Sequence, residues 1–142
     1  MKQGVGFSVT INIIAIFIVV TFAFLVATLN YYKTYKINNA ISDSIEKYEG
    51  YNTLAKKEIE NKLISFGYVK NGKKCSNDSK YGKLENPNTN DGYCIYYQDN
   101  IDETGKFKYV IITYLNMNIP IINTTLNLPV KTTTQPIYYF SD

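Results

Sequence analysis

The chain has 142 residues, of which 15 are basic and 12 acidic, so its formal net charge is only +3. A surface that follows nucleic-acid phosphates needs a stronger basic excess, so no nucleic-acid partner is expected. Histidine, the commonest general base and metal ligand, is absent from the sequence. Its absence argues against most enzyme classes and against a metal cofactor. We therefore expect a protein that is not an enzyme and that carries no cofactor.

The charged residues are distributed unevenly. No charged side chain occurs from Gln3 to Tyr32, and Ile13–Leu29 is apolar apart from two threonines. A helix of about 25 residues is roughly 37 Å long, enough to cross a hydrocarbon core of about 30 Å. Cleaved signal peptides have a shorter apolar region followed by a small-x-small site. The sequence therefore predicts a transmembrane helix over 7–30, with the lipid bilayer as a partner.

The apolar pattern continues beyond this segment. Over 31–50, most apolar residues recur at three- or four-residue spacing with charged residues mostly between them, which predicts an amphipathic continuation of the same helix. No proline or glycine interrupts the chain from Phe7 to Glu49, and Gly50 is the expected C′ residue. The apolar positions are Tyr31, Tyr35, Ile37, Ile41, Ile45 and Tyr48.

A second, shorter helix is expected next. Asn52 or Thr53 can cap its N-terminus, and Gly67 can end it. Its apolar stripe is predicted to consist of Leu54, Ala55, Ile59 and Leu63.

The composition of the remaining sequence is typical of strands and turns. Tyr93–Gln98 and Lys106–Met117 are rich in tyrosine, isoleucine and valine, and a hairpin loop is predicted over Asp99–Gly105. Phe107–Leu115 is apolar on both faces, as a central strand would be. Prolines confine the last strands to short or edge positions. These prolines are Pro120, Pro129 and Pro136.

The predicted fold class is α+β. A long N-terminal helix, transmembrane and then amphipathic, packs on a small antiparallel sheet of about four strands in a single-pass membrane protein. The apolar side of 31–50 and the apolar face of the sheet each need a partner, and packing them together buries both.

Cys75 and Cys94 are the only cysteines, and they flank a polar segment. Their separation does not fit the C-x-x-C spacing of zinc or redox sites. In an oxidising compartment they would close a disulfide loop worth about 3 kcal/mol. In a cytosolic domain they would be two reduced thiols. The sequence favours the disulfide, and with it an exported domain.

Two polar features are candidate sites. The segment Asn86–Gly92 resembles a calcium loop, but Asp91 and Tyr97 stand where such a loop needs glycine and glutamate. A polar, turn-rich loop is expected there instead.

Asn12 is the polar residue deepest in the apolar segment, and a side-chain amide in lipid forms hydrogen bonds with another helix. Asn12 therefore suggests helix–helix assembly, and an interfacial position near the end of the span explains it equally.

The N-terminus carries the most specific pattern. Met1–Gly6 is a short leader with one lysine, followed by Phe7, Ser8 and an apolar helix that extends into an amphipathic one. This arrangement resembles the type IV pilin and pseudopilin family, including its tight-adherence branch. The resemblance covers residues 1–50 by motif and the rest by architecture. Ile11 stands where the family usually carries a glutamate.

The resemblance implies a pilin-like fold and cleavage between Gly6 and Phe7, with 1–6 as a leader-like segment. It also implies that 51–142 is an extracytoplasmic α+β domain of a cell-membrane or surface-filament protein. The implied partners are a prepilin peptidase and other pilin-like subunits. The expected function is a structural subunit of a bacterial surface filament or secretion apparatus, assembling through the apolar helix. The alternative is a single-pass anchored protein whose extracytoplasmic domain binds a ligand or partner and does not polymerise.

Overall fold

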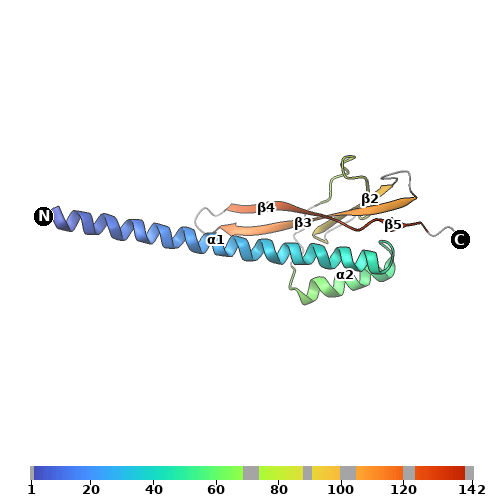
Figure 1. The fold of residues 1–142 in the computed structure, drawn as a ribbon, viewed down its shortest axis with the longest axis horizontal. Coiled ribbons are helices and arrows are strands. Elements are labelled where there is room, and N and C mark those ends of the chain that lie inside the picture. The colour runs from blue at the N-terminus through green and yellow to red at the C-terminus, as the bar shows by residue number, and fades with distance from the viewer. Residues whose placement is uncertain (1, 69–73, 88–90, 100–104, 120–123, 140–142) are drawn as a thin grey trace.

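The computed structural model describes residues 2–68, 74–87, 91–99, 105–119 and 124–139. Within these residues, two helices precede a five-stranded antiparallel sheet, so the α+β class is confirmed. The sheet lies along the C-terminal half of one long helix, whose N-terminal half extends alone (Figure 1). The elements are α1 (Lys2–Lys47), α2 (Thr53–Ser65), β1 (Lys83–Leu84), β2 (Tyr93–Asp99), β3 (Lys106–Ile119), β4 (Thr124–Thr133) and β5 (Ile137–Tyr138).

Helix α1 is a single helix, as predicted, but its end differs from the prediction by one residue. The amide of Gly50 donates to the carbonyl of Ile45 (2.9 Å) and that of Glu49 donates to Glu46 (3.1 Å). These two bonds form a Schellman motif with Glu49 at C′, where its φ is 55°. Gly50 follows at C″ with φ 155°, which favours glycine. The prediction that Gly50 is the C′ residue was therefore wrong.

Helix α2 begins and ends where the sequence indicates. The side chain of Asn52 accepts a hydrogen bond from the amide of Ala55 (3.0 Å), and Gly67 occupies C′ with φ 59°. Leu54, however, is 61% exposed. Because each residue turns the helix by about 100°, Leu54 lies beside the apolar stripe and not in it. The buried residues of α2 are Ala55, Ile59 and Leu63.

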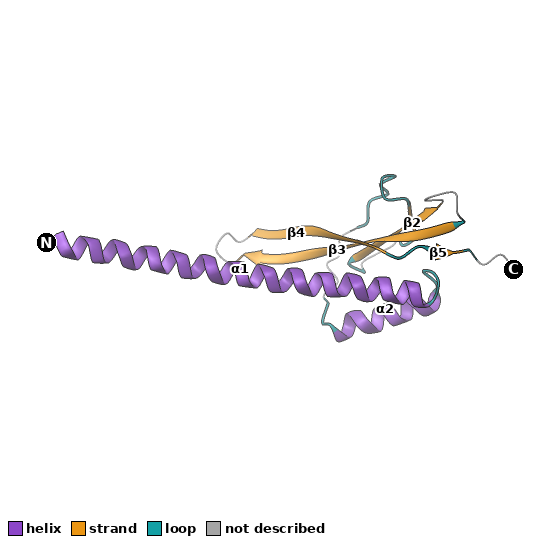
Figure 2. Ribbon diagram, viewed as in Figure 1, coloured by secondary structure: helices purple, strands orange, loops and turns teal. Residues whose placement is uncertain are grey.

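Strand β3 is central, as its two apolar faces predict. It pairs with β2 on one side and with β4 and then β5 on the other (Figure 2). The pairing of Asp99 with Phe107 confirms the β2–β3 hairpin. Most of the loop predicted over Asp99–Gly105 lies outside the described residues, which resume at Gly105.

The strand that contains Pro129, β4, lies at an edge of the sheet, as predicted, but with ten residues it is not short. Thr134 and Tyr109 bond each other through Thr134 N–H to Tyr109 O and Tyr109 N–H to Thr134 Oγ1, both 2.9 Å. Hydrogen-bonded and non-hydrogen-bonded pairs alternate along β3 and β4, so the pair of Tyr114 with Pro129 is a non-hydrogen-bonded one. The backbone nitrogen of Pro129 therefore points away from β3, and its missing N–H costs no hydrogen bond between the strands. Pro136 separates β4 from β5, and Pro120 lies outside the described residues.

The two faces of the sheet bury different clusters. One face packs against α1, where Ile37, Ile41 and Ile45 are at most 1% exposed, and side chains of α2 complete the same cluster. The opposite face buries a smaller cluster around Cys94 and Tyr96. The sheet residues that face the helices are Tyr93, Ile95, Phe107, Tyr109, Ile111 and Ile137.

Replacing Ile41 by alanine should lower the free energy of unfolding by about 2–5 kcal/mol, because it leaves a cavity in the helix–sheet core. Ile16→Ala is the matched control, since Ile16 is on the same helix but 64% exposed. It should change stability by less than about 0.5 kcal/mol. Denaturant titration of the full chain in detergent, followed by circular dichroism, measures both. Equal losses would show that α1 does not dock through this face.

Candidate functional site: the exposed apolar half of α1 and its base

The N-terminal half of α1 presents an apolar surface that the rest of the described chain does not cover. Every valine, leucine, isoleucine and phenylalanine from Phe7 to Leu29 is 48–72% exposed. The helix is long and apolar enough to cross a membrane, and none of its most apolar stretch is buried inside the protein. Leaving such a surface in water costs about 25 cal/mol per Å². This half of α1 therefore needs an apolar environment supplied from outside the fold.

Three threonines in this half satisfy their own hydroxyl groups. Each Oγ1 donates to the carbonyl four residues earlier, at 2.8 Å for Thr10 and Thr21 and 2.9 Å for Thr28. A polar group without a partner is costly in hydrocarbon. These bonds make the threonines compatible with an apolar environment.

The sequence-predicted site residues of this half are exposed. Gly6 and Phe7 lie within α1, which runs without a break through their junction. A Cβ on Gly6, or on Gly4 nearby, would meet nothing within 4 Å, so the fold itself places no demand on either glycine. Asn12 lies roughly seven turns before Ile37, on the same side of the helix as the docked isoleucines. Cleavage at Gly6–Phe7 and assembly through Asn12 stay predictions.

The base of this surface is the buried half of α1, which is held by polar as well as apolar contacts. Asn38, which is 0% exposed, donates from Nδ2 to the carbonyl of Val130 (2.9 Å). Glu46 Oε1 accepts from the amide of Gln135 (2.8 Å) and from Ser42 Oγ (3.1 Å). These bonds hold α1 against β4 and against the segment between β4 and β5. This polar row is not among the residues that the apolar pattern of the sequence indicates, although Asn38 and Ser42 are spaced four apart.

A charged cluster joins α1 to α2. Glu58 accepts from Lys47 Nζ at 2.7 Å and from Lys62 Nζ at 2.8 Å, and Lys62 also donates to the buried Ser44 Oγ at 2.9 Å. The hydrogen bond from Lys47, followed by that from Lys62, lowers the pKa of Glu58 from 4.5 to about 2. The same bond to Glu58 raises the pKa of Lys47. The cluster holds the two helices side by side.

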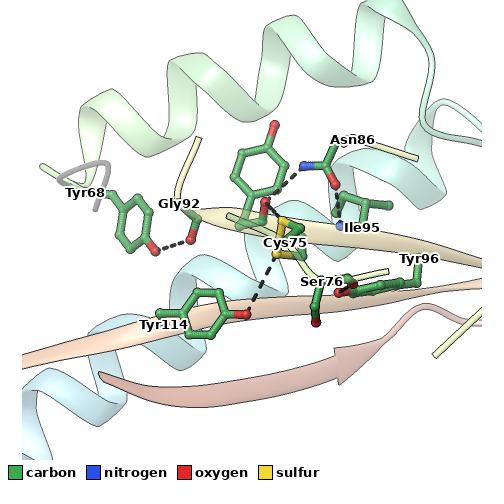
Figure 3. Close-up of a disulfide and its surroundings, with 10 residues drawn as sticks. Tyr68, Cys75, Ser76, Asn86, Gly92, Ile95, Tyr96 and Tyr114 are labelled. Atoms are coloured by element: carbon green, nitrogen blue, oxygen red, sulfur yellow. Dashed lines mark hydrogen bonds between the residues drawn. A yellow bond between two sulfur atoms is a disulfide. The ribbon is translucent and has the colours of Figure 1, made fainter. Parts of the chain in front are cut away.

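The predicted disulfide is present between Cys75 and Cys94, with a Cα–Cα distance of 5.6 Å. Figure 3 shows it beside the face of the sheet that points away from α1. The segment after Cys75 crosses this face, where the Tyr96 hydroxyl donates to the carbonyl of Ser76 (2.7 Å). The ring of Tyr81 lies 5.5 Å from that of Tyr96. The disulfide thus secures a cover over the second cluster, a role that the sequence did not indicate.

Asn86 has a structural role. Its Nδ2 donates to the carbonyl of Tyr93 (2.9 Å). Its Oδ1 accepts from the amide of Ile95 (2.8 Å), as Figure 3 shows. The side chain therefore binds the strand edge and has little capacity left for a cation. Within the described part of the chain, no group of three or more cysteine, aspartate or glutamate side chains could hold a metal ion.

No protein-family model matches the chain, and neither a curated protein nor a solved structure matches it. Its own geometry defines its class. It is an α+β protein whose described residues include one helix long and apolar enough to span a membrane and one disulfide.

Stability should depend on the charge of Glu58 at low pH. Its folded pKa of about 2 lies below the ordinary 4.5, so its stabilising effect is present above pH 4.5 and is lost as the pH falls towards 2. Glu58→Gln should flatten the fall in melting temperature over this range. Glu60→Gln, an exposed change on the same helix, is the control. Parallel curves for the parent and Glu58→Gln would contradict this coupling.

Removing the disulfide by Cys75→Ala with Cys94→Ala should lower the free energy of unfolding by about 3 kcal/mol, because the unfolded chain gains the freedom of the open loop. Denaturant titration with and without a reductant measures the loss. Reductant should destabilise the parent and leave the double variant unchanged. A parent that does not respond to complete reduction would show that the bond is not stabilising.

Proposed function

We propose that the chain is a pilin-like or pseudopilin-like structural subunit of a bacterial surface filament or secretion apparatus. The observation that carries this proposal is the exposed apolar half of α1, which continues as one helix into the segment that supports the sheet. Two environments bury such a half-helix: lipid, and the apolar helices of neighbouring subunits. A subunit that passes from membrane to filament uses both in turn.

In the membrane, 7–30 spans the bilayer and 51–142 lies outside the cytoplasm. The 23 residues from Phe7 to Leu29 extend about 34 Å as a helix, which matches a core of about 30 Å. Tyr31 and Tyr32 follow directly and are 55% and 64% exposed, as residues of an interfacial aromatic belt would be. The Cys75–Cys94 disulfide supports the orientation, since such bonds persist in oxidising compartments.

In the filament, the position of α1 determines the position of the domain. No proline or glycine interrupts α1 after Gly6, and Ile37, Ile41 and Ile45 are buried in the sheet. The domain therefore follows the helix as one body when apolar helices associate. Asn12, on the side of the docked isoleucines, supplies an amide for a bond between neighbouring helices. The partners of this function are further copies or related subunits, and a prepilin peptidase.

One observation favours a second function, that of a single-pass anchor whose extracytoplasmic domain binds a ligand or partner without polymerising. Ile11 is 50% exposed on α1 at the position where the pilin pattern has a glutamate. A chain without that charge lacks one means of aligning neighbouring subunits.

Replacing Gly6 by valine should block processing and assembly, because a peptidase that cuts after glycine has no room for a branched side chain. Gly4→Val is the matched control, since both glycines lie in α1 with open space around them. N-terminal sequencing of membrane-extracted protein from cells that carry a prepilin peptidase measures cleavage. Phe7 should be the first residue of the parent and of Gly4→Val, and Met1 or Lys2 that of Gly6→Val.

Crosslinking of the same cells separates the two functions. Higher oligomers in the parent and their loss in Gly6→Val support a filament subunit. An intact N-terminus with monomers throughout supports the anchor and contradicts the leading proposal.

A further inference from the structure

We propose that a pocket at the base of the exposed apolar half binds the phosphate group of one anionic membrane lipid. The inference rests on the membrane anchoring proposed above. The pocket holds about 160 Å³ and lies between α1, the C-terminal turn of α2 and β3. Its polar lining comes from Asn30, Lys33, Thr34, Gly67, Tyr68 and Tyr114.

The pocket lies at the depth of lipid phosphates. Leu29 is the last residue of the apolar stretch, and Lys33 follows one helical turn later, about 6 Å along the axis. The headgroup region extends roughly 5–8 Å beyond each side of the hydrocarbon core. An anchored chain therefore holds the Lys33 ammonium group beside the phosphates of its own leaflet.

The chemistry of the lining suits a monoanionic phosphate. Lys33 Nζ donates to the carbonyl of Gly67 at 3.3 Å, and an ammonium group has three N–H donors, so two remain for phosphate oxygens. The amide of Asn30 adds a neutral donor at the same wall. The described residues that line the pocket include no aspartate or glutamate, so no carboxylate in that lining repels an anion.

The neighbouring Lys36 allows binding in the pocket to be distinguished from general electrostatic attraction to the membrane. It lies one turn after Lys33 on the same helix and is also exposed, but its ammonium group is 5.2 Å from the centroid of the Phe66 ring, and it does not line the pocket. A charged bilayer surface attracts both lysines to a similar degree. A phosphate held in the pocket depends on Lys33.

The experiment uses the full chain in nonionic detergent, titrated with phosphatidylglycerol or phosphatidylcholine, with bound lipid counted by native mass spectrometry. One phosphatidylglycerol should bind per chain. Lys33→Gln should weaken its binding about tenfold or more, since a charge-assisted hydrogen bond is lost. Lys36→Gln should weaken it less than about twofold, and Lys33→Arg should retain binding because it keeps the charge.

The proposal is overturned by equal weakening in Lys33→Gln and Lys36→Gln, by equal binding of both lipids, or by loss of binding in Lys33→Arg. Displacement of the lipid by an equal concentration of inorganic phosphate would also overturn it, because the ligand would then be a soluble phosphate. Carbonate extraction of membranes tests the proposed membrane anchoring independently of lipid binding. Retention of the parent and Lys33→Gln in the membrane shows that anchoring holds whatever the lipid result, whereas extraction of the parent contradicts the anchor itself.

Discussion

The packing of three isoleucines of α1 against the sheet is the contact on which the rest of the structure depends. Ile37, Ile41 and Ile45 fill one apolar cluster together with side chains of α2, β2, β3 and β5. Without this contact the amphipathic half of α1 would have no partner, and the sheet would expose its larger apolar face. The same contact fixes the direction in which the apolar half extends, because both halves belong to one uninterrupted helix.

Helix α1 thereby serves two environments at once. Its C-terminal half buries isoleucines in the fold, bonds β4 through Asn38, and bonds the segment between β4 and β5 through Glu46. Its N-terminal half exposes large apolar side chains and satisfies its threonine hydroxyls internally. Lys33 lies where the two environments meet, bonded to the C-terminal turn of α2 through Gly67. The proposed anchoring, assembly and lipid binding all use this division of one helix.

Some local features were readable from sequence, and similar ones nearby were not. Gly67 occupies C′ as predicted, whereas at the end of α1 Glu49 takes that position and Gly50 follows it. The difference arises because both Glu49 (φ 55°) and Gly50 (φ 155°) have positive φ values at this helix end, and the glycine fills the second of the two positions. The disulfide was favoured by the lone cysteine pair, but the cluster that its loop covers was not indicated. Recognising that cluster required knowing that Cys94 and Tyr96 share the face opposite α1.

The sequence by itself determined the long helix, its division into an apolar and an amphipathic half, the central position of β3 and the cysteine pair. These features follow from periodicity, length and composition, which are properties of neighbouring residues. Only the tertiary structure decided the buried bond of Asn38 to Val130, the charged cluster around Glu58 and the pocket beside Lys33. Each of these joins separate elements of the chain, and their meeting depends on how the sheet and α2 dock on α1. Hydrogen bonds and ion pairs act only over a few ångströms, so no local pattern specifies such distant partners.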